Sequence, residues 1–188
     1  MTDTERPLRA DARRNRERIM AAAAELFARH GREAQMEEIA ARSGLGIGTL
    51  YRHFPTKSAL LTAMVGARFA RMAETARAAE LIEDPGEAFE SLVRGYLEAA
   101  DGDAAFQLAL MGSEQVSWDG LRAEKAAFFD VVTRVIERAA AAGKVRADLT
   151  FADFRLLTRG VIASMYFKEG GNPDWRRHLD LVLAGVRP

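Results

Sequence analysis

The sequence predicts an all-α protein of about nine helices. Apolar residues recur at helical spacing along nearly the whole chain, and no segment alternates apolar and polar residues as a half-buried strand would. Alanine, the best helix former, occurs 35 times in 188 residues, against only five prolines. These observations together indicate a helical protein without a sheet.

The first four helices are predicted before residue 81. Asp11 is a good N-cap for the first of them, and Gly31 is a good residue to end it. Pro55 cannot continue the third helix, and Thr56 can cap the fourth. We expect these four helices over residues 11–30, 36–43, 47–54 and 57–80.

Five further helices are predicted beyond this point. The segment Asp84-Pro85-Gly86-Glu87 supplies an N-cap, a proline at the first helical position and a glutamate at the third, which is close to a capping box. Residues 112–120 are expected to form a loop. The five helices are expected from residue 85 to about 100, through Phe106 and Leu110, up to Gly143, from Thr150 to Gly170, and from Asn172 onward.

The charge distribution is uneven, although the net charge is zero. Residues 1–58 hold 11 basic and 8 acidic side chains, and six arginines fall between Arg6 and Arg18 against two acidic residues. This basic end could lie along DNA phosphates, its part before Asp11 could enter a minor groove, or that part could form a solvated tail.

Several classes of chemistry are disfavoured by the residues present. The chain has no cysteine, its three histidines lie far apart, and no serine has the Gly-x-Ser-x-Gly context of a hydrolase. We therefore expect no enzyme, no metal site and no cofactor. No uncharged stretch is longer than ten residues, the length of residues 104–113, which is too short for a membrane span, and the N-terminus lacks the features of a secretory signal. We expect a cytoplasmic protein without a membrane partner.

Residues 36–61 have the pattern of a helix-turn-helix. Two short helices are separated by a tight turn in which Gly44 can take a positive φ angle. Leu45, Leu50 and Phe54 are expected to anchor this unit on the first helix. The residues left to face outward are Ile47, Gly48, Thr49, Tyr51, Arg52 and His53. A helical hairpin without a ligand is the alternative, but the neighbouring basic arm favours DNA binding.

The string GLGIGTLYRHFPTKSALL, at residues 44–61, resembles the hallmark of TetR-type transcriptional regulators. The preceding RNRERIMAAAAELFARHG resembles the first helix of that family. The resemblance implies a DNA-binding domain over residues 1–55 and a helical ligand-binding and dimerisation domain over residues 56–188. It also implies a homodimer, paired through its last two helices, that represses by binding a palindromic operator in double-stranded DNA and is released by a small-molecule effector. The alternative function is an all-helical small-molecule-binding or scaffold module without DNA binding.

Charge and resemblance together assign DNA contacts to particular residues. We expect phosphate contacts from Arg13, Arg14, Arg16, Thr49, Tyr51, His53, Thr56 and Lys57. We expect base contacts from Ile47, Gly48, Tyr51 and Arg52. The chain departs from the family where Gln35 and Gly46 stand at positions that often hold serine or threonine, so two hydroxyls that commonly meet DNA are missing.

The C-terminal half holds many large apolar side chains. Most of them are expected to form the core, and the resemblance implies that some line a ligand cavity, which is typically apolar with a few polar groups. The candidates for this cavity are Tyr96, Phe106, Met111, Trp118, Phe129 and Met165.

Overall fold

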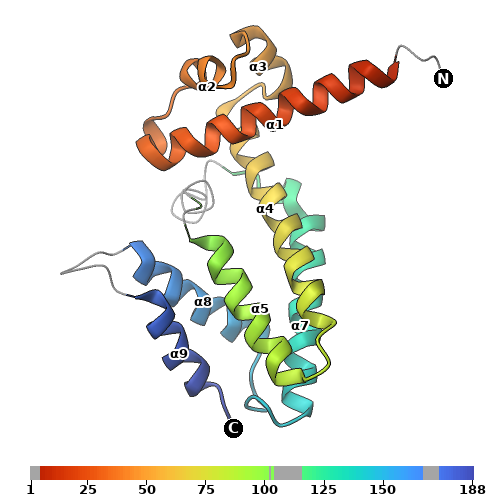
Figure 1. Cartoon of the computed structure of the whole chain (residues 1–188), viewed down its shortest axis with the longest axis vertical. Helices are drawn as coiled ribbons and strands as arrows, with labels where there is room; N and C mark the ends of the chain where they lie inside the picture. The colour runs from red at the N-terminus through yellow and green to blue at the C-terminus, as the bar shows by residue number, and fades with distance from the viewer. Residues whose placement is uncertain (1–4, 102, 104–115, 167–173) are drawn as a thin grey trace. The chain divides into compact units, whose positions relative to one another are not determined.

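The computed structural model of the chain describes residues 5–101, 103, 116–166 and 174–188 (Figure 1). These residues form eight α-helices and two short 3₁₀ helices, with no strand among them, so the predicted all-α fold is confirmed. The elements are α1 (Glu5–His30), η1 (Gly31–Glu33), α2 (Met36–Ser43), α3 (Ile47–His53), α4 (Lys57–Glu80), α5 (Pro85–Ala100), η3 (Asp119–Leu121), α7 (Arg122–Ala141), α8 (Phe151–Tyr166) and α9 (Trp175–Gly185).

The chain divides into two compact units. We call the first unit, residues 1–67 and 102–121, the head, and the second, residues 68–101 and 122–188, the body. Helix α4 is shared, because its first residues up to Ala67 belong to the head and those from Arg68 onward belong to the body.

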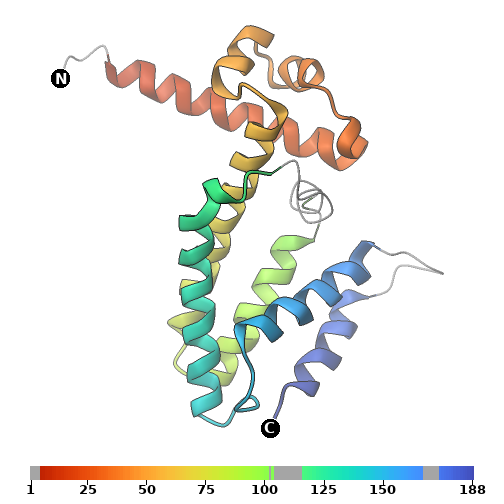
Figure 2. The ribbon, with the colours of Figure 1, turned by 180° about the vertical axis from the view of Figure 1, so that it is seen from behind.

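The head is built on α1, which packs against α2, while α2 packs against α3 (Figures 1 and 2). Its core consists of apolar side chains spaced by three or four residues along each helix, as the sequence pattern predicted. Each such side chain contributes about 1.5–3 kcal/mol when fully buried. The largest fully buried members are Ile19, Phe27, Ile39, Leu50, Phe54, Leu60, Leu61 and Val65.

Helix α1 begins at Glu5 and not at the predicted Asp11. Pro7 lies in the first turn, where a proline is tolerated because the backbone N–H groups there have no intrahelical partner. The Asp11 carboxylate pairs instead with the Arg14 guanidinium one turn further along the helix. The basic segment before Asp11 is therefore helical from Glu5 onward.

Three further expectations concern less regular segments. The predicted loop over residues 112–120 contains the 3₁₀ helix η3 at its end, and its residues 112–115 lie outside the described residues. The predicted helix through Phe106 and Leu110 also lies outside them. Helix α9 begins at Trp175 with Asp174 as its N-cap, whereas its expected start at Asn172 is not among the described residues.

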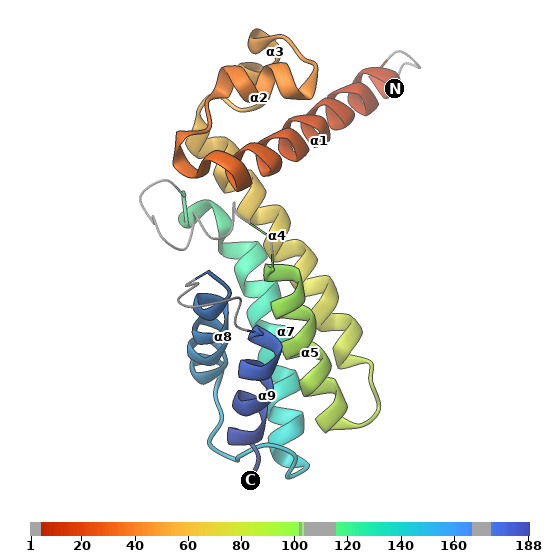
Figure 3. The same ribbon diagram turned by 60° about the vertical axis from the view of Figure 1, so that its left-hand side comes forward.

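In the body, α5 packs against α7 and α8, and α8 packs against α9 (Figures 1 and 3). Side chains fix where these helices begin. Asp84 caps α5 by accepting hydrogen bonds from the N–H groups of Gly86 and Glu87 at 2.8 and 2.9 Å. Thr150 and Asp153 form a capping box before α8, in which each side chain accepts from the other residue's backbone N–H.

The centre of the body is an aromatic cluster. The Tyr96 ring stacks on the Phe128 ring at 5.7 Å between centroids and meets the edge of the Phe154 ring at 5.4 Å. Such pairs add stability beyond the burial of their area. The aromatic cluster comprises Phe69, Tyr96, Phe128, Phe129, Phe151 and Phe154, from α4, α5, α7 and α8.

None of the helices in the described part of the chain has the length and apolar character that crossing a bilayer requires.

Candidate nucleic-acid interface

The turn between α2 and α3 has the geometry of a helix-ending Schellman motif. Gly44 lies in the left-handed region at φ 66° and ψ 31°. Its N–H donates to the Ala41 carbonyl, and the Leu45 N–H donates to the Ala40 carbonyl, both at 3.1 Å. Glycine suits this position because a side chain at positive φ is strained. The turn therefore fixes the direction in which α3 leaves α2.

Helix α1 holds this turn through polar contacts. The Arg18 guanidinium donates to the Gly44 carbonyl at 3.3 Å, and the Arg42 guanidinium forms an ion pair with the Glu25 carboxylate at 2.6 Å. The Arg16 guanidinium lies 4.7 Å from the centre of the Phe54 ring, which is cation–π distance. These contacts join α1 to α2 and to the end of α3, so the three helices present one surface.

Helix α3 has two distinct faces. Leu50 points inward and is completely buried, as predicted. Ile47 and Tyr51 lie one turn apart on the outer face and expose 40% and 43% of their surfaces. A seven-residue helix with two large apolar side chains in solvent is a candidate contact surface. On the same helix, the Arg52 guanidinium donates to the Thr49 hydroxyl at 2.8 Å.

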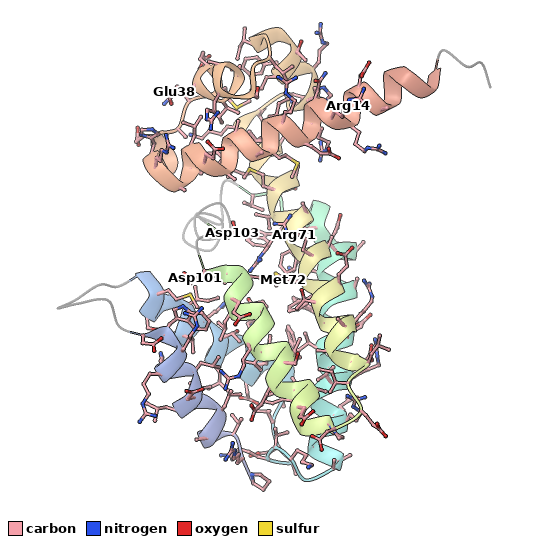
Figure 4. All side chains as sticks on the ribbon, in the orientation of Figure 1. Arg14, Glu38, Arg71, Met72, Asp101 and Asp103 are labelled. Atoms are coloured by element: carbon pink, nitrogen blue, oxygen red, sulfur yellow. The ribbon has the colours of Figure 1, made fainter. Side chains whose placement is uncertain are left out.

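The departures from the family pattern are visible at the helix starts. Gly46 is the N-cap of α3 and provides no side-chain cap. Gln35 is the N-cap of α2, and its backbone N–H donates to the Glu38 carboxylate at 3.1 Å, so the acidic side chain satisfies one backbone donor at this helix start. Figure 4 labels Glu38 at the start of α2.

Two of the residues expected to contact phosphates, Thr56 and Lys57, lie at the start of α4. The Thr56 hydroxyl accepts a hydrogen bond from the Ala59 N–H at 3.0 Å and so caps α4. The Lys57 ammonium lies 5.7 Å from the centre of the Phe27 ring on α1. His53 at the end of α3 is half-buried beside Phe54, with ring centroids 6.4 Å apart. All three residues thus lie at the junction of α1, α3 and α4.

The three arginines expected to meet phosphates lie exposed along α1, but their surroundings differ. Arg14, labelled in Figure 4, pairs with Asp11. Arg13 lies 3.8 Å from the Glu17 carboxylate, and both side chains are mostly exposed. Arg16 packs on Phe54. Such exposed pairs are weak and give way readily to a stronger anion.

Two structural contributors were missed by the sequence reasoning. Arg18 was counted in the basic arm without a role, and the Glu25–Arg42 pair was not anticipated. Each contact joins residues far apart in the sequence, 26 and 17 positions respectively. The only local signal was the presence of these charges beside an apolar stripe.

The residues expected to line a ligand cavity are distributed over both units. Tyr96 and Phe129 come together in the aromatic cluster, where both contact Phe128. Met165 is buried on α8, and Trp118 belongs to the head. The candidates Phe106 and Met111 lie outside the described residues.

Two hollows in the body are lined by other residues. One, between α5, α8 and α9, is apolar and has a volume of about 10 Å³, enough for at most one water. The other, of about 280 Å³, is lined by both apolar and charged residues, and the charged ones include Asp84, Lys144 and Arg187. Among the described residues, no group of three or more histidine, cysteine or acidic side chains is arranged to hold a metal ion.

The sequence and the fold are similar to those of known bacterial regulatory proteins. Residues 19–64 match the family described as bacterial regulatory proteins of the tetR family, and residues 84–188 match the C-terminal domain of SbtR-like transcriptional regulators. The crystal structure of a TetR regulatory protein from Mycobacterium vanbaalenii is 34% identical, covers 97% of this chain and all of that one, and superposes with a TM-score of 0.69. The TetR regulator SCO0520 from Streptomyces coelicolor is 31% identical over 92% of this chain and 98% of that one, with a TM-score of 0.62.

Among curated relatives, the repressor KstR from Mycolicibacterium smegmatis is 44% identical over 69 residues, which are 36% of this chain. The chain spans about a third of the length of the curated relatives that it matches, 34% in the case of KstR. These relatives are transcriptional regulators and not enzymes.

Proposed function

The chain belongs to the TetR family of bacterial transcriptional regulators, and we propose that it is a homodimeric repressor that binds a palindromic operator and is released by a small-molecule ligand. The observation that supports it most strongly is the outer face of α3, where Ile47 and Tyr51 are exposed on a helix held rigidly by the Gly44 turn. Such a helix is the element that a helix-turn-helix inserts into the major groove. A regulator of this kind acts on the chromosome, so we place it in the cytoplasm.

We assign the DNA contacts by chemistry. Tyr51 and Arg52, with Ile47 and Gly48 beside them, are proposed to meet base edges, because they lie on the exposed side of α3. Phosphate contacts are proposed from residues of α1, of α3 itself and of the start of α4. These residues are Arg13, Arg14, Arg16, Thr49, Tyr51, His53, Thr56 and Lys57. Residues 1–55 would thus form the DNA-binding domain.

We propose that two copies pair through α8 and α9. Leu156 on α8 exposes 63% of its surface and Leu181 on α9 exposes 57%, although each helix also carries a buried apolar stripe. Apolar side chains left in solvent on two packed helices suit an interface with a second copy. A two-fold dimer would carry two α3 helices to half-sites one DNA turn apart, about 34–36 Å, or a multiple of it.

Release by a ligand requires that the ligand bind one state of the dimer better than the other. We place the ligand in the helical domain over residues 56–188, with Tyr96, Phe106, Met111, Trp118, Phe129 and Met165 as candidate contacts. Since α4 runs from the head into the body, it is the element through which a change in the body would reach α3.

The test begins with selection of bound sites from a pool of random duplexes, followed by fluorescence anisotropy titrations at several salt concentrations. The wild type is expected to lose affinity linearly on a log–log scale, with a slope of about −0.9 for each phosphate contacted. Lys57→Ala is expected to weaken binding to selected and random duplexes alike, whereas Arg52→Ala changes the preference between them. If both variants changed the preference equally, the assignment of roles would be wrong. Failure to bind any duplex at low salt would reject DNA binding and leave the ligand-binding module.

A further inference from the structure

The ridge of α3 that faces away from the core is formed by Gly48 and Arg52. Because an α-helix turns by about 100° per residue, each of them lies about 160° around the helix from the fully buried Leu50 between them. Both residues are exposed, and they are one turn apart. Nothing lies within 4 Å of a Cβ added at Gly48. This ridge therefore combines one long cationic side chain with a position of bare backbone.

The Arg52 side chain is already held in one direction. A long side chain on a helix leans toward the helix N-terminus, over the residues three and four positions before it. Arg52 follows this rule, because its guanidinium donates to the Thr49 hydroxyl at 2.8 Å. This hydrogen bond orders a flexible side chain before any partner arrives, so less conformational entropy is lost when the guanidinium binds one. The Thr49 hydroxyl still has its own proton, which it can donate to a phosphate.

The chemistry of the guanidinium favours a base with two neighbouring acceptors. Helix α3 has no acidic residue, so Arg52 has no counter-charge on its own helix. The hydrogen bond to Thr49 uses one terminal nitrogen, and the planar fork has further N–H groups. In the major groove, guanine presents O6 and N7 as acceptors to such a fork, whereas adenine presents its N7 acceptor beside an amino donor. Guanine is therefore the base that suits Arg52.

We propose that each operator half-site contains a guanine that Arg52 reads through O6 and N7, that the Thr49 hydroxyl positions the guanidinium for this contact, and that the bare backbone at Gly48 lets α3 approach the base edge closely. Arg52 is the residue that touches the base, and Thr49 is a positioning residue. This inference rests on the proposed function, since it names the base that the DNA-binding helix recognises.

The first experiment removes one acceptor from one guanine at a time. Guanines of the selected duplex are replaced singly by 7-deazaguanine, which lacks N7 but still pairs with cytosine, and the Kd is measured by anisotropy at low salt, where phosphate contacts keep weak variants measurable. We expect one guanine in each half-site whose replacement weakens binding by about fivefold or more. Arg52→Ala, at an exposed helical position, should fold and bind both duplexes equally. Lys57→Ala is the control, and it should bind both more weakly but keep the difference between them.

Variants of Thr49 test its positioning role. Thr49→Val removes the hydroxyl at nearly unchanged size, whereas Thr49→Ser keeps it. Loss of a phosphate contact would weaken binding to both duplexes alike, so the ratio of the two Kd values reports on the Arg52 contact alone. We expect Thr49→Val to reduce this ratio by about twofold or more, and Thr49→Ser to preserve it.

The open space at Gly48 provides a test of close approach. Alanine favours a helix more than glycine does, and its Cβ would meet nothing within 4 Å, so Gly48→Ala should keep or raise the Tm. Its affinity for the selected duplex is nevertheless expected to fall, because the added methyl group lies between the backbone and the base edge. Unchanged affinity would overturn the close approach.

The outcomes distinguish this inference from the proposed function. If no guanine is sensitive to replacement, or if the sensitivity survives in Arg52→Ala, the reading of guanine is overturned, while binding of the wild type to its selected duplex leaves the proposed function intact. An unchanged ratio in Thr49→Val overturns the positioning role. If the wild type binds no duplex at low salt, the proposed function itself fails.

Discussion

At the scale of single residues, Gly44 forms the turn that orients α3, the helix proposed to contact DNA. Its φ of 66° is strained for any residue with a side chain, and an added Cβ would lie 2.8 Å from the Arg18 guanidinium. We expect Gly44→Ala to destabilise the protein by about 1–2 kcal/mol, the cost of a left-handed residue with a Cβ. Because the Arg18 guanidinium must also move, its hydrogen bond to the Gly44 carbonyl should be lost, and we expect the affinity for the selected duplex to fall.

Gly143 provides the matched control for this substitution. It has φ 65°, its N–H donates to the Ala140 carbonyl and the Lys144 N–H donates to the Ala139 carbonyl, the same pattern as at Gly44, but nothing lies within 4 Å of an added Cβ. Gly143→Ala is expected to lose similar stability and keep full DNA affinity. Urea unfolding and anisotropy measure the two effects, and an equal loss of DNA affinity in both variants would contradict the argument.

Asp84 makes the stability of α5 depend on pH. The backbone N–H of Glu87 and the ammonium of Lys144 hold the pKa of Asp84 below its ordinary value of 3.8. A carboxyl with a lowered folded-state pKa stabilises the protein above 3.8, and this contribution is lost as the pH falls from 3.8 through the folded pKa. Asp84→Asn keeps an oxygen for the cap but cannot titrate. We expect its urea stability to fall less steeply than that of the wild type over this acid range. Parallel curves would count against a role for the Asp84 charge.

At the scale of elements, the sequence predicted helix ends well where a single residue decides them. The starts of α3 and α4 follow from the Gly44 turn and from Pro55 and Thr56, and all lie where they were expected. The predicted start of α1 at Asp11 was wrong, because the helix begins at Glu5 and the Asp11 carboxylate pairs with Arg14 inside it. The residue type of Asp11 alone cannot show whether its carboxylate caps a helix or pairs with a nearby arginine.

Contacts between helices could not be predicted from the sequence for a different reason. The outward face of α3 could be predicted, since it follows from helical periodicity around Leu50. The contact of Arg18 with Gly44 could not be, because it depends on how α1 crosses the turn. Likewise, Tyr96 and Arg68 lie 28 positions apart, and nothing in either segment alone indicates that they meet.

The proposed dimer interface on α8 and α9 can be tested by substitution. If Leu156 and Leu181 face a second copy, placing a carboxylate at each buries two unpaired charges per subunit in the interface. We expect Leu156→Glu/Leu181→Glu to be a folded monomer, with a light-scattering mass near 20.7 kDa at micromolar concentration. The control is Leu81→Glu, at a leucine that exposes 86% of its surface just after α4, which should remain a dimer. Dissociation of the control, or persistence of the double variant as a dimer, would argue against this interface.

At the scale of the whole molecule, the proposed homodimer would gain its affinity for an operator from two heads that bind together. Once one head is bound, the second binds as if at high local concentration, which typically raises the overall affinity by about 10²–10⁴ without any new contact. The Leu156→Glu/Leu181→Glu variant leaves Tyr51, Arg52 and Lys57 unchanged. Each of its heads should therefore still bind DNA, but alone.

This leads to a prediction that separates assembly from recognition. The wild type is expected to bind a duplex with both half-sites far more tightly than one with a single half-site, whereas the double variant binds the two equally. Its log–log salt slope should be about half that of the wild type, because one head contacts half as many phosphates. Anisotropy titrations on both duplexes measure this, with Leu81→Glu expected to behave as the wild type. A double variant that still preferred the complete site would show that α8 and α9 do not bring the two heads together.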